Sequence, residues 1–298
     1  MRKAIVLPAT ALLGGVAGFF LRRWELATAF EADTGLPIPN APAFWALVLL
    51  SLAVAAGLAF FLRGTHKTTE GGYDQAFAAK GNTVYVTVTV LSAFLLLAAG
   101  GIMLAALPAA YQTALDTAVQ SARPGLSALV AVLPKAVMAL LALGSFAGML
   151  ALGRNSYRGD GKGKYSLPLL LPGYLTAFWL ITAYQSHAGD PIRQDYIYKM
   201  FAILAILLAL CFMAGYSFEK GKFFRTALSS LLAVYFSLVT LADKPDMTTA
   251  LLLGGFILYL TAAVTALIYN DERRMARPAP GQAEDETEIK TEELTDEG

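Results

Sequence analysis

Polar residues that could do chemistry lie in the segments between long apolar runs. They are Arg22, Arg23, Trp24, Glu25, Glu31, Asp33, Lys135, His187, Asp190, Arg193, Asp243 and Asp246. Carboxylates and arginines that share one surface can bind a polar solute, because ionised groups make the strongest hydrogen bonds. A second carboxylate in contact with Glu25 or His187 would permit general acid–base chemistry. These residues are therefore candidates for ligand binding or for an interface, and none has an assigned catalytic role.

The apolar runs lack the residue patterns of common membrane enzymes. They contain no histidine that could ligate haem, no aspartate pair and no H-E-x-x-H zinc helix. The single cysteine, Cys211, cannot form a disulfide or a cysteine metal site within one chain, and we expect it to be a buried small hydrophobe. We therefore expect no metal and no cofactor, and an enzyme is disfavoured.

The composition is that of a membrane protein. Apolar residues make up 56% of the 298 residues and charged residues only 15%, well below the usual quarter of soluble domains. A helix needs roughly 20 apolar residues to cross a bilayer, and barrel strands would show strict alternation. The candidate spans are residues 4–21, 44–62, 84–107, 136–152, 167–184, 200–216, 223–241 and 248–269. The expected fold is an all-α polytopic transmembrane helical bundle of about eight spans, whose partner is the lipid bilayer and not nucleic acid.

Lysine and arginine counts predict the orientation. The connectors on the side of the two termini hold fifteen of these residues and the opposite connectors hold seven. Because cytoplasmic loops carry the excess of positive charge, both termini should be cytoplasmic. The first apolar run ends at two arginines without a small-x-small cleavage site, so we expect it to be a retained span and not a cleaved signal peptide.

The segment after the first span predicts an interfacial helix on the outer side. Trp24, Ala27 and Phe30 recur at helical spacing, and charged residues occupy much of the remaining surface. We expect the arginines to reach the headgroups while Trp24 anchors the helix. The stretch RRWELATAFEADTGLPIP, residues 22–39, resembles segments of uncharacterised multi-pass bacterial membrane proteins. This resemblance implies a bacterial inner membrane and brings no function with it.

Residues 108–135 contain a second outer amphipathic segment and an ambiguity. One face of residues 108–122 is apolar and the others carry uncharged polar groups. If the fourth span starts near residue 136, Lys135 lies at the outer boundary and its amine reaches the headgroups. If instead residues 126–133 enter the bilayer, Lys135 becomes an ionisable group inside the membrane and hence a functional candidate.

The chain divides into a membrane domain, residues 1–277, and an acidic tail, residues 278–298. The tail holds eight acidic residues and only Lys290, so it should be a disordered cytoplasmic segment. Leu-Pro pairs and Pro-Ile pairs recur in both halves, which suggests a four-plus-four repeat of residues 1–153 and 165–277. Hydroxyl and small residues in the last two spans favour close helix packing, with a polar pocket lining as the alternative.

Three functional hypotheses remain open. The first is a non-catalytic accessory, sensing or assembly subunit that binds another membrane protein or a second copy of itself. The second is a permease or solute-binding component with a site under the outer face. Its candidate residues are Glu25, Glu31, Asp33, Asp190, Arg193, Asp243 and Asp246. The third is an enzyme acting on lipid headgroups, in which Glu25 or His187 would have to meet another carboxylate.

Overall fold

The protein is an all-helical bundle. The computed structural model describes residues 2–31, 33–63, 72–119, 123–159, 165–187, 189, 192, 194 and 196–275. The helices are α1 (Arg2–Thr28), α2 (Pro42–Arg63), α3 (Tyr73–Ala76), α4 (Thr83–Ala105), α5 (Leu107–Thr117), α6 (Pro124–Arg158), α7 (Ser166–Ser186), α8 (Ile197–Tyr216), α9 (Phe223–Thr240), the 3-10 helix η2 (Leu241–Asp243) and α10 (Met247–Met275). Within the described residues the only strand-like pairing is an isolated antiparallel bridge between Phe30 and Pro37. Eight helical segments are long and apolar enough to cross a membrane, which confirms the predicted fold class.

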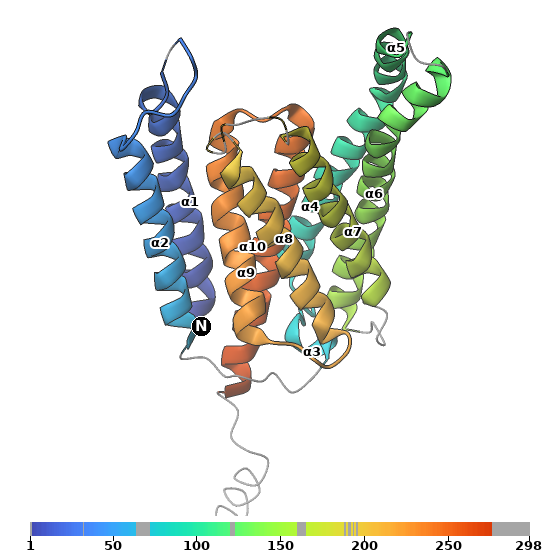
Figure 1. The fold of residues 1–298 in the computed structure, drawn as a ribbon. Coiled ribbons are helices and arrows are strands. Elements are labelled where there is room, and N and C mark those ends of the chain that lie inside the picture. Colours follow the sequence, from blue (N-terminus) through green and yellow to red (C-terminus); the bar gives the residue numbers. More distant parts are fainter. Residues whose placement is uncertain are drawn as a thin grey trace, which may run out of the picture.

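Six helices close a ring of contacts. α10, α4, α6, α7, α8 and α9 each pack against the next, and α9 packs back against α10. α1 packs on the outside of α9 and α10, and α2 packs mainly on α1 (Figure 1). We call the end of the bundle where α1 begins and α10 ends the terminal face, and the opposite end, where η2 lies, the loop face.

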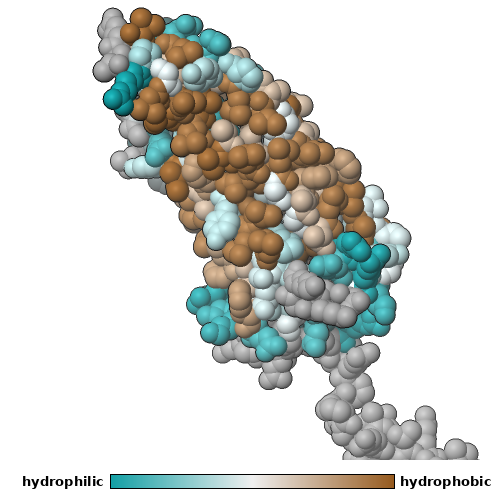
Figure 2. All heavy atoms as spheres, turned by 90° about the vertical axis from the view of Figure 1, so that its right-hand side faces the viewer, coloured by the Kyte–Doolittle hydropathy of each residue, from teal (hydrophilic) through white to brown (hydrophobic). Residues whose placement is uncertain are grey.

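The surface of the bundle matches a bilayer. Large apolar side chains are exposed along the outer sides of the spans, as at Leu49 (63%), Phe60 (72%) and Leu140 (63%). In the view of the side that carries α4 and α6, a broad hydrophobic band runs between more hydrophilic ends (Figure 2). A surface of this kind is stable only against hydrocarbon, so the protein is a multi-pass membrane protein.

Small residues bring the helices of the ring together. The Ser92 hydroxyl on α4 donates a hydrogen bond of 2.7 Å to the Gly255 carbonyl on α10. A Cβ atom at Gly255 would lie 2.5 Å from the Leu96 side chain, so the two backbones approach closely because residue 255 has no side chain. Ser230, Ser237 and Thr240 on α9 are buried as well. Close helix packing, the first of the two predicted roles for these residues, is therefore the main one.

The short helix α3 fills the terminal end of the ring. Tyr73 and Phe77 are buried there, and the Tyr73 ring stacks on Tyr165 with ring centroids 4.4 Å apart. Burial, followed by the influence of neighbouring tyrosines, raises the pKa of Tyr73 well above its ordinary value. The Asn270 amide on α10 donates hydrogen bonds of 3.0 Å to the carbonyls of Ala76 and Ala78. α10 therefore fixes the segment that leads into α4.

The helix of the fourth span, α6, begins earlier and ends later than predicted. α6 runs without a break from Pro124 through Pro134 to Arg158, so residues 126–133 belong to the same helix as the fourth span. At about 1.5 Å per residue its 35 residues extend about 52 Å, well beyond a hydrocarbon core of about 30 Å. Lys135 is exposed and lies about 29 Å along this helix from Arg154, which is consistent with an amine that reaches the loop-face headgroups.

Two sequence-based expectations need correction. The predicted interfacial helix after the first span is not a separate element, because α1 continues without interruption to Thr28. Cys211, expected to be buried, is exposed on the surface of α8, where a thiol can contact lipid. The acidic tail lies outside the described residues, and the four-plus-four repeat stays a prediction.

Candidate functional site

The last turns of α1 carry two charged residues that face the interior of the bundle. Arg22 and Glu25 are three residues apart and therefore lie on one side of the helix. Both side chains are 0% exposed. Arg23 and Trp24, on the other side of α1, are exposed. Of the residues predicted to form the polar side of this segment, Arg22 and Glu25 thus point inward, whereas Arg23 and Thr28 are exposed. The expectation that both arginines reach the headgroups is therefore wrong for Arg22, because its charge is paired inside the protein.

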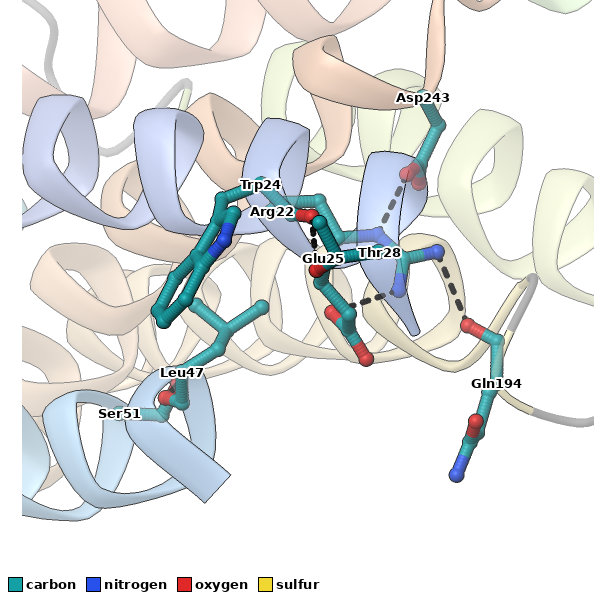
Figure 3. Close-up of polar contacts among 8 residues, drawn as sticks. All are labelled: Arg22, Trp24, Glu25, Thr28, Leu47, Ser51, Gln194 and Asp243. Atoms are coloured by element: carbon teal, nitrogen blue, oxygen red, sulfur yellow. Dashed lines mark hydrogen bonds and ion pairs between the residues drawn. The ribbon is translucent and has the colours of Figure 1, made fainter. Parts of the chain in front are cut away.

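Arg22 is the centre of a buried ion cluster at the loop face. Its Nε donates to Asp243 Oδ1 at 2.7 Å, its Nη1 to Glu25 Oε2 at 2.9 Å, and its Nη2 to the Gln194 carbonyl at 2.9 Å (Figure 3). The guanidinium carbon lies 5.1 Å from the centroid of the Tyr198 ring. All three nitrogens of the guanidinium group therefore donate to acceptors inside the protein.

The cluster joins four parts of the chain. Glu25 belongs to α1, Asp243 to η2, Gln194 to the connector before α8, and Tyr198 to the first turn of α8. A planar guanidinium group with donors in a fixed geometry can bond three differently placed acceptors at once, which a lysine cannot. The Asp243 side chain is 17% exposed, so the cluster reaches the surface of the protein at this edge. This arrangement can fix the relative positions of α1, α8 and α9, which η2 follows directly.

The remaining predicted residues lie apart from this cluster or outside the described chain. Glu31, Asp33 and Asp246 are exposed at the loop face, as are Arg23, Trp24 and Lys135. Glu31 accepts a hydrogen bond of 2.6 Å from the Thr34 hydroxyl, which stabilises the turn after α1. Asp190 and Arg193 lie outside the described residues. Of the predicted residues that are described, the structure therefore brings together Arg22, Glu25 and Asp243.

Two of the predicted residues complete helix ends. Asp246 accepts a hydrogen bond of 3.2 Å from the Thr249 amide in the first turn of α10. Burial alone would raise the pKa of Asp246, but hydrogen bonds from Thr249 and Thr248 and the charge of Lys199 outweigh it, so the pKa is lowered. His187 follows α7, and its Nδ1 lies 2.8 Å from the Ala183 carbonyl. These contacts indicate roles in helix capping.

Two contacts of the loop-face half were not predicted from the sequence. The Tyr198 ring beside Arg22 belongs to a helix far away in sequence, and nothing in the residue order pairs the two. The Tyr235 hydroxyl on α9 lies 2.8 Å from the Ser51 hydroxyl on α2. The one signal available for the cluster was the three-residue spacing of Arg22 and Glu25, which places both on the same side of any helix that continues past residue 21.

A second feature lies on the lipid-facing side, between α8 and α9. It is a groove of about 400 Å³, called here the α8–α9 groove. Its walls are mostly large apolar side chains, namely Phe201, Leu204, Leu208, Phe212, Phe224, Leu228, Leu232 and Phe236. Arg225 also lines the groove but leaves its surface almost entirely apolar. Its floor includes the small residues Ala205 and Ser229, and the Ser229 hydroxyl donates to the Arg225 carbonyl of its own helix at 2.7 Å. The groove is thus apolar and shaped by aromatic rings.

Comparisons with protein-family models, with curated proteins and with solved structures found no match to this chain. Among the described residues, no three His, Cys, Asp or Glu side chains gather closely enough to hold a metal ion. The Arg22 cluster and the α8–α9 groove are therefore the features of this chain that bear on its function.

Proposed function

We propose that this protein is a non-catalytic accessory or assembly subunit of a bacterial inner membrane, which receives a helix of another membrane protein in the α8–α9 groove. The observation that carries the proposal is the groove itself. Transmembrane helices associate by close van der Waals packing over small residues, and the floor at Ala205 and Ser229 permits this approach. The phenylalanine walls supply a large and stiff contact area.

The Arg22 cluster supports this proposal as a brace. Its guanidinium nitrogens already donate to Asp243, Glu25 and Gln194, so binding an anionic solute at Arg22 would require breaking bonds that hold the helices together. Neither the α8–α9 groove nor the terminal-face cavity described below is lined by Arg22, Glu25 or Asp243. A rigid scaffold that carries an apolar groove is well suited to hold a partner in place.

The orientation is part of the same proposal. Fifteen Lys and Arg residues belong to the terminal-face connectors and ends, against seven at the loop face, which supports a cytoplasmic terminal face. The acidic tail would then lie in the cytoplasm. The Arg22 cluster would lie at the periplasmic side, close to the headgroups.

Cross-linking and co-purification in mild detergent, compared between variants, test the proposed function. L208W introduces a bulky ring into the wall of the groove at a position that is 40% exposed. L52W, at a 62% exposed position of α2, is the matched control. We expect a specific partner to be retained by the wild type and by L52W and lost from L208W, with equal melting temperatures. A partner retained by L208W, or a monomer that carries solute across reconstituted vesicles, would overturn the proposal. A partner identified as a second copy of this chain would make the assembly a homo-oligomer.

A further inference from the structure

A cavity of about 690 Å³ opens at the terminal face, between the start of α4, the end of α10 and the start of α1. Its mouth is polar and contains Lys80 and Arg273. Farther into the membrane its walls are mainly aliphatic and include Val84, Val88 and Ala266. We call it the α4–α10 cavity.

Within the part of the chain that the structure describes, neither basic residue at the mouth forms an ion pair. Lys80 and Arg273 are both exposed, and no described carboxylate lies within ion-pair distance of either. The segment that carries Lys80 is held against α10 by the hydrogen bonds of Asn270 to the carbonyls of Ala76 and Ala78. Two positively charged residues therefore line one opening. They can bind a single anionic group that lies between them.

The start of α4 increases the positive potential at this opening. Asn82 caps the helix by accepting a hydrogen bond of 3.1 Å from the Tyr85 amide. Asn82, Val84 and Tyr85 line the cavity, so the N-terminus of α4, where the helix dipole favours a negative charge, lies beside it. The helix end adds to the positive potential of the two side chains, which are sufficient by themselves to locate the site.

The length of the cavity matches one leaflet of the bilayer. The lining residues of α10 extend from Thr261 to Arg273, a rise of about 18 Å, whereas half of a hydrocarbon core is about 15 Å. The cavity is flanked by lipid-facing side chains, because Ile5 is 69% exposed and Val84 is 71% exposed. An occupant with one anionic end and a long apolar chain would contact both the mouth and the walls.

We infer that the α4–α10 cavity binds an anionic phospholipid, with its phosphate between Lys80 and Arg273 and an acyl chain along Val84, Val88 and Ala266. A soluble phosphate would leave the aliphatic walls uncovered. A partner helix would make no use of the two cations. Basic pockets between spans at the surface of a membrane are known to bind anionic headgroups. Thr261 and Thr265, predicted either to pack helices or to line a polar pocket, both line this cavity.

Lipid titration of the full-length protein in a mild detergent tests the inference. Native mass spectrometry would count bound phosphatidylglycerol and phosphatidylcholine, and thermal melting would report the stabilisation by each lipid. We expect phosphatidylglycerol to bind more tightly. Its affinity should fall about fivefold when one cation is removed, in K80Q or R273Q, and about thirtyfold in K80Q/R273Q. K220Q/K222Q is the matched control, because it removes two exposed lysines of the same face that do not line the cavity.

Further measurements separate the lipid from a free anion. A266F places a ring on the aliphatic wall and should reduce retention of phosphatidylglycerol while leaving both cations in place. Glycerol phosphate and inorganic phosphate should bind far more weakly than the lipid. The inference is overturned if phosphatidylcholine binds as tightly as phosphatidylglycerol, if K220Q/K222Q weakens binding as much as K80Q/R273Q, or if glycerol phosphate binds as tightly as the lipid. Surface substitutions such as K80Q keep the test valid even if A266F does not fold.

Discussion

Replacing Arg22 by leucine should destabilise the protein more than any other single change at the loop face. In R22L the Glu25 carboxylate stays 0% exposed, and Glu25 and Asp243 each lose a hydrogen bond from the guanidinium group. Removal of one member of a buried charge pair costs about 3–5 kcal/mol, since the other charge stays buried without it. For a chain of this size each kcal/mol lowers the melting temperature by about 2–4 °C, so a decrease of about 6–20 °C is expected.

Thermal unfolding of the purified protein, followed by circular dichroism at constant detergent concentration, measures this effect. The control R23L removes the neighbouring exposed arginine and should change stability by less than about 0.5 kcal/mol. R22K keeps the charge but cannot donate in three fixed directions, so its melting temperature should lie between those of R22L and the wild type. In R22L/E25L/D243L, where no stranded carboxylate remains, much of the loss should be recovered. Equal melting temperatures for R22L and R23L would refute the assignment of Arg22 as a brace.

Three further predictions concern the cap of α10, the close contact of α4 with α10 and the orientation in the membrane. D246A should lower stability by about 1 kcal/mol through loss of the cap on α10, whereas D246N should retain most of it. The pKa of Asp246 is lowered in the folded protein, so its carboxylate should stabilise the protein fully above about pH 4. The difference in stability between the wild type and D246N should disappear as the pH falls through the pKa that Asp246 has in the folded protein. G255A should lower the free energy of unfolding by about 1–3 kcal/mol, because the added Cβ would collide with Leu96, and thermal melting would measure the loss. The control G57A on α2, where a Cβ meets nothing within 4 Å, should be neutral or stabilising. In a C211S background, a membrane-impermeant maleimide should label D33C in intact cells and K220C only after permeabilisation, and the opposite pattern would reverse the proposed orientation.

The number and positions of the spans could be predicted, because an apolar run that is long enough to cross the hydrocarbon core of a bilayer is visible in the sequence. The ends of spans were harder, since helix propensity does not stop where hydrophobicity stops. α1 continues through two arginines to Thr28, and Asp243 and Gln194 accept hydrogen bonds from Arg22 there. α6 continues through Pro134 with α5 packed against it. Tertiary contacts decide such boundaries.

The three charged members of the candidate site were selected from the sequence, but Gln194, Tyr198 and the arrangement of the cluster were not. Arg22, Glu25 and Asp243 were all selected as outer charges, yet their convergence depends on how α1 packs against α9, which no single segment encodes. The inward direction of Arg22 was not predicted, because a cation at the end of a span is ordinarily expected to reach the headgroups. The α4–α10 cavity was missed because Lys80 and Arg273 are 193 positions apart and each alone is an ordinary interfacial cation.

The wide separation of the Arg22 partners in the chain has a consequence for biogenesis. Arg22 and Asp243 are 221 positions apart, so about 11–44 s of synthesis at 5–20 residues per second separate the two ends of this ion pair. Until then, Glu25, three residues away on the same helix, is an acceptor that is available to Arg22 from the start. The local pair thus lowers the cost of early insertion, and the bond to Asp243 forms when η2 emerges. The loop-face ion cluster can therefore be completed only after the first seven spans have been synthesised.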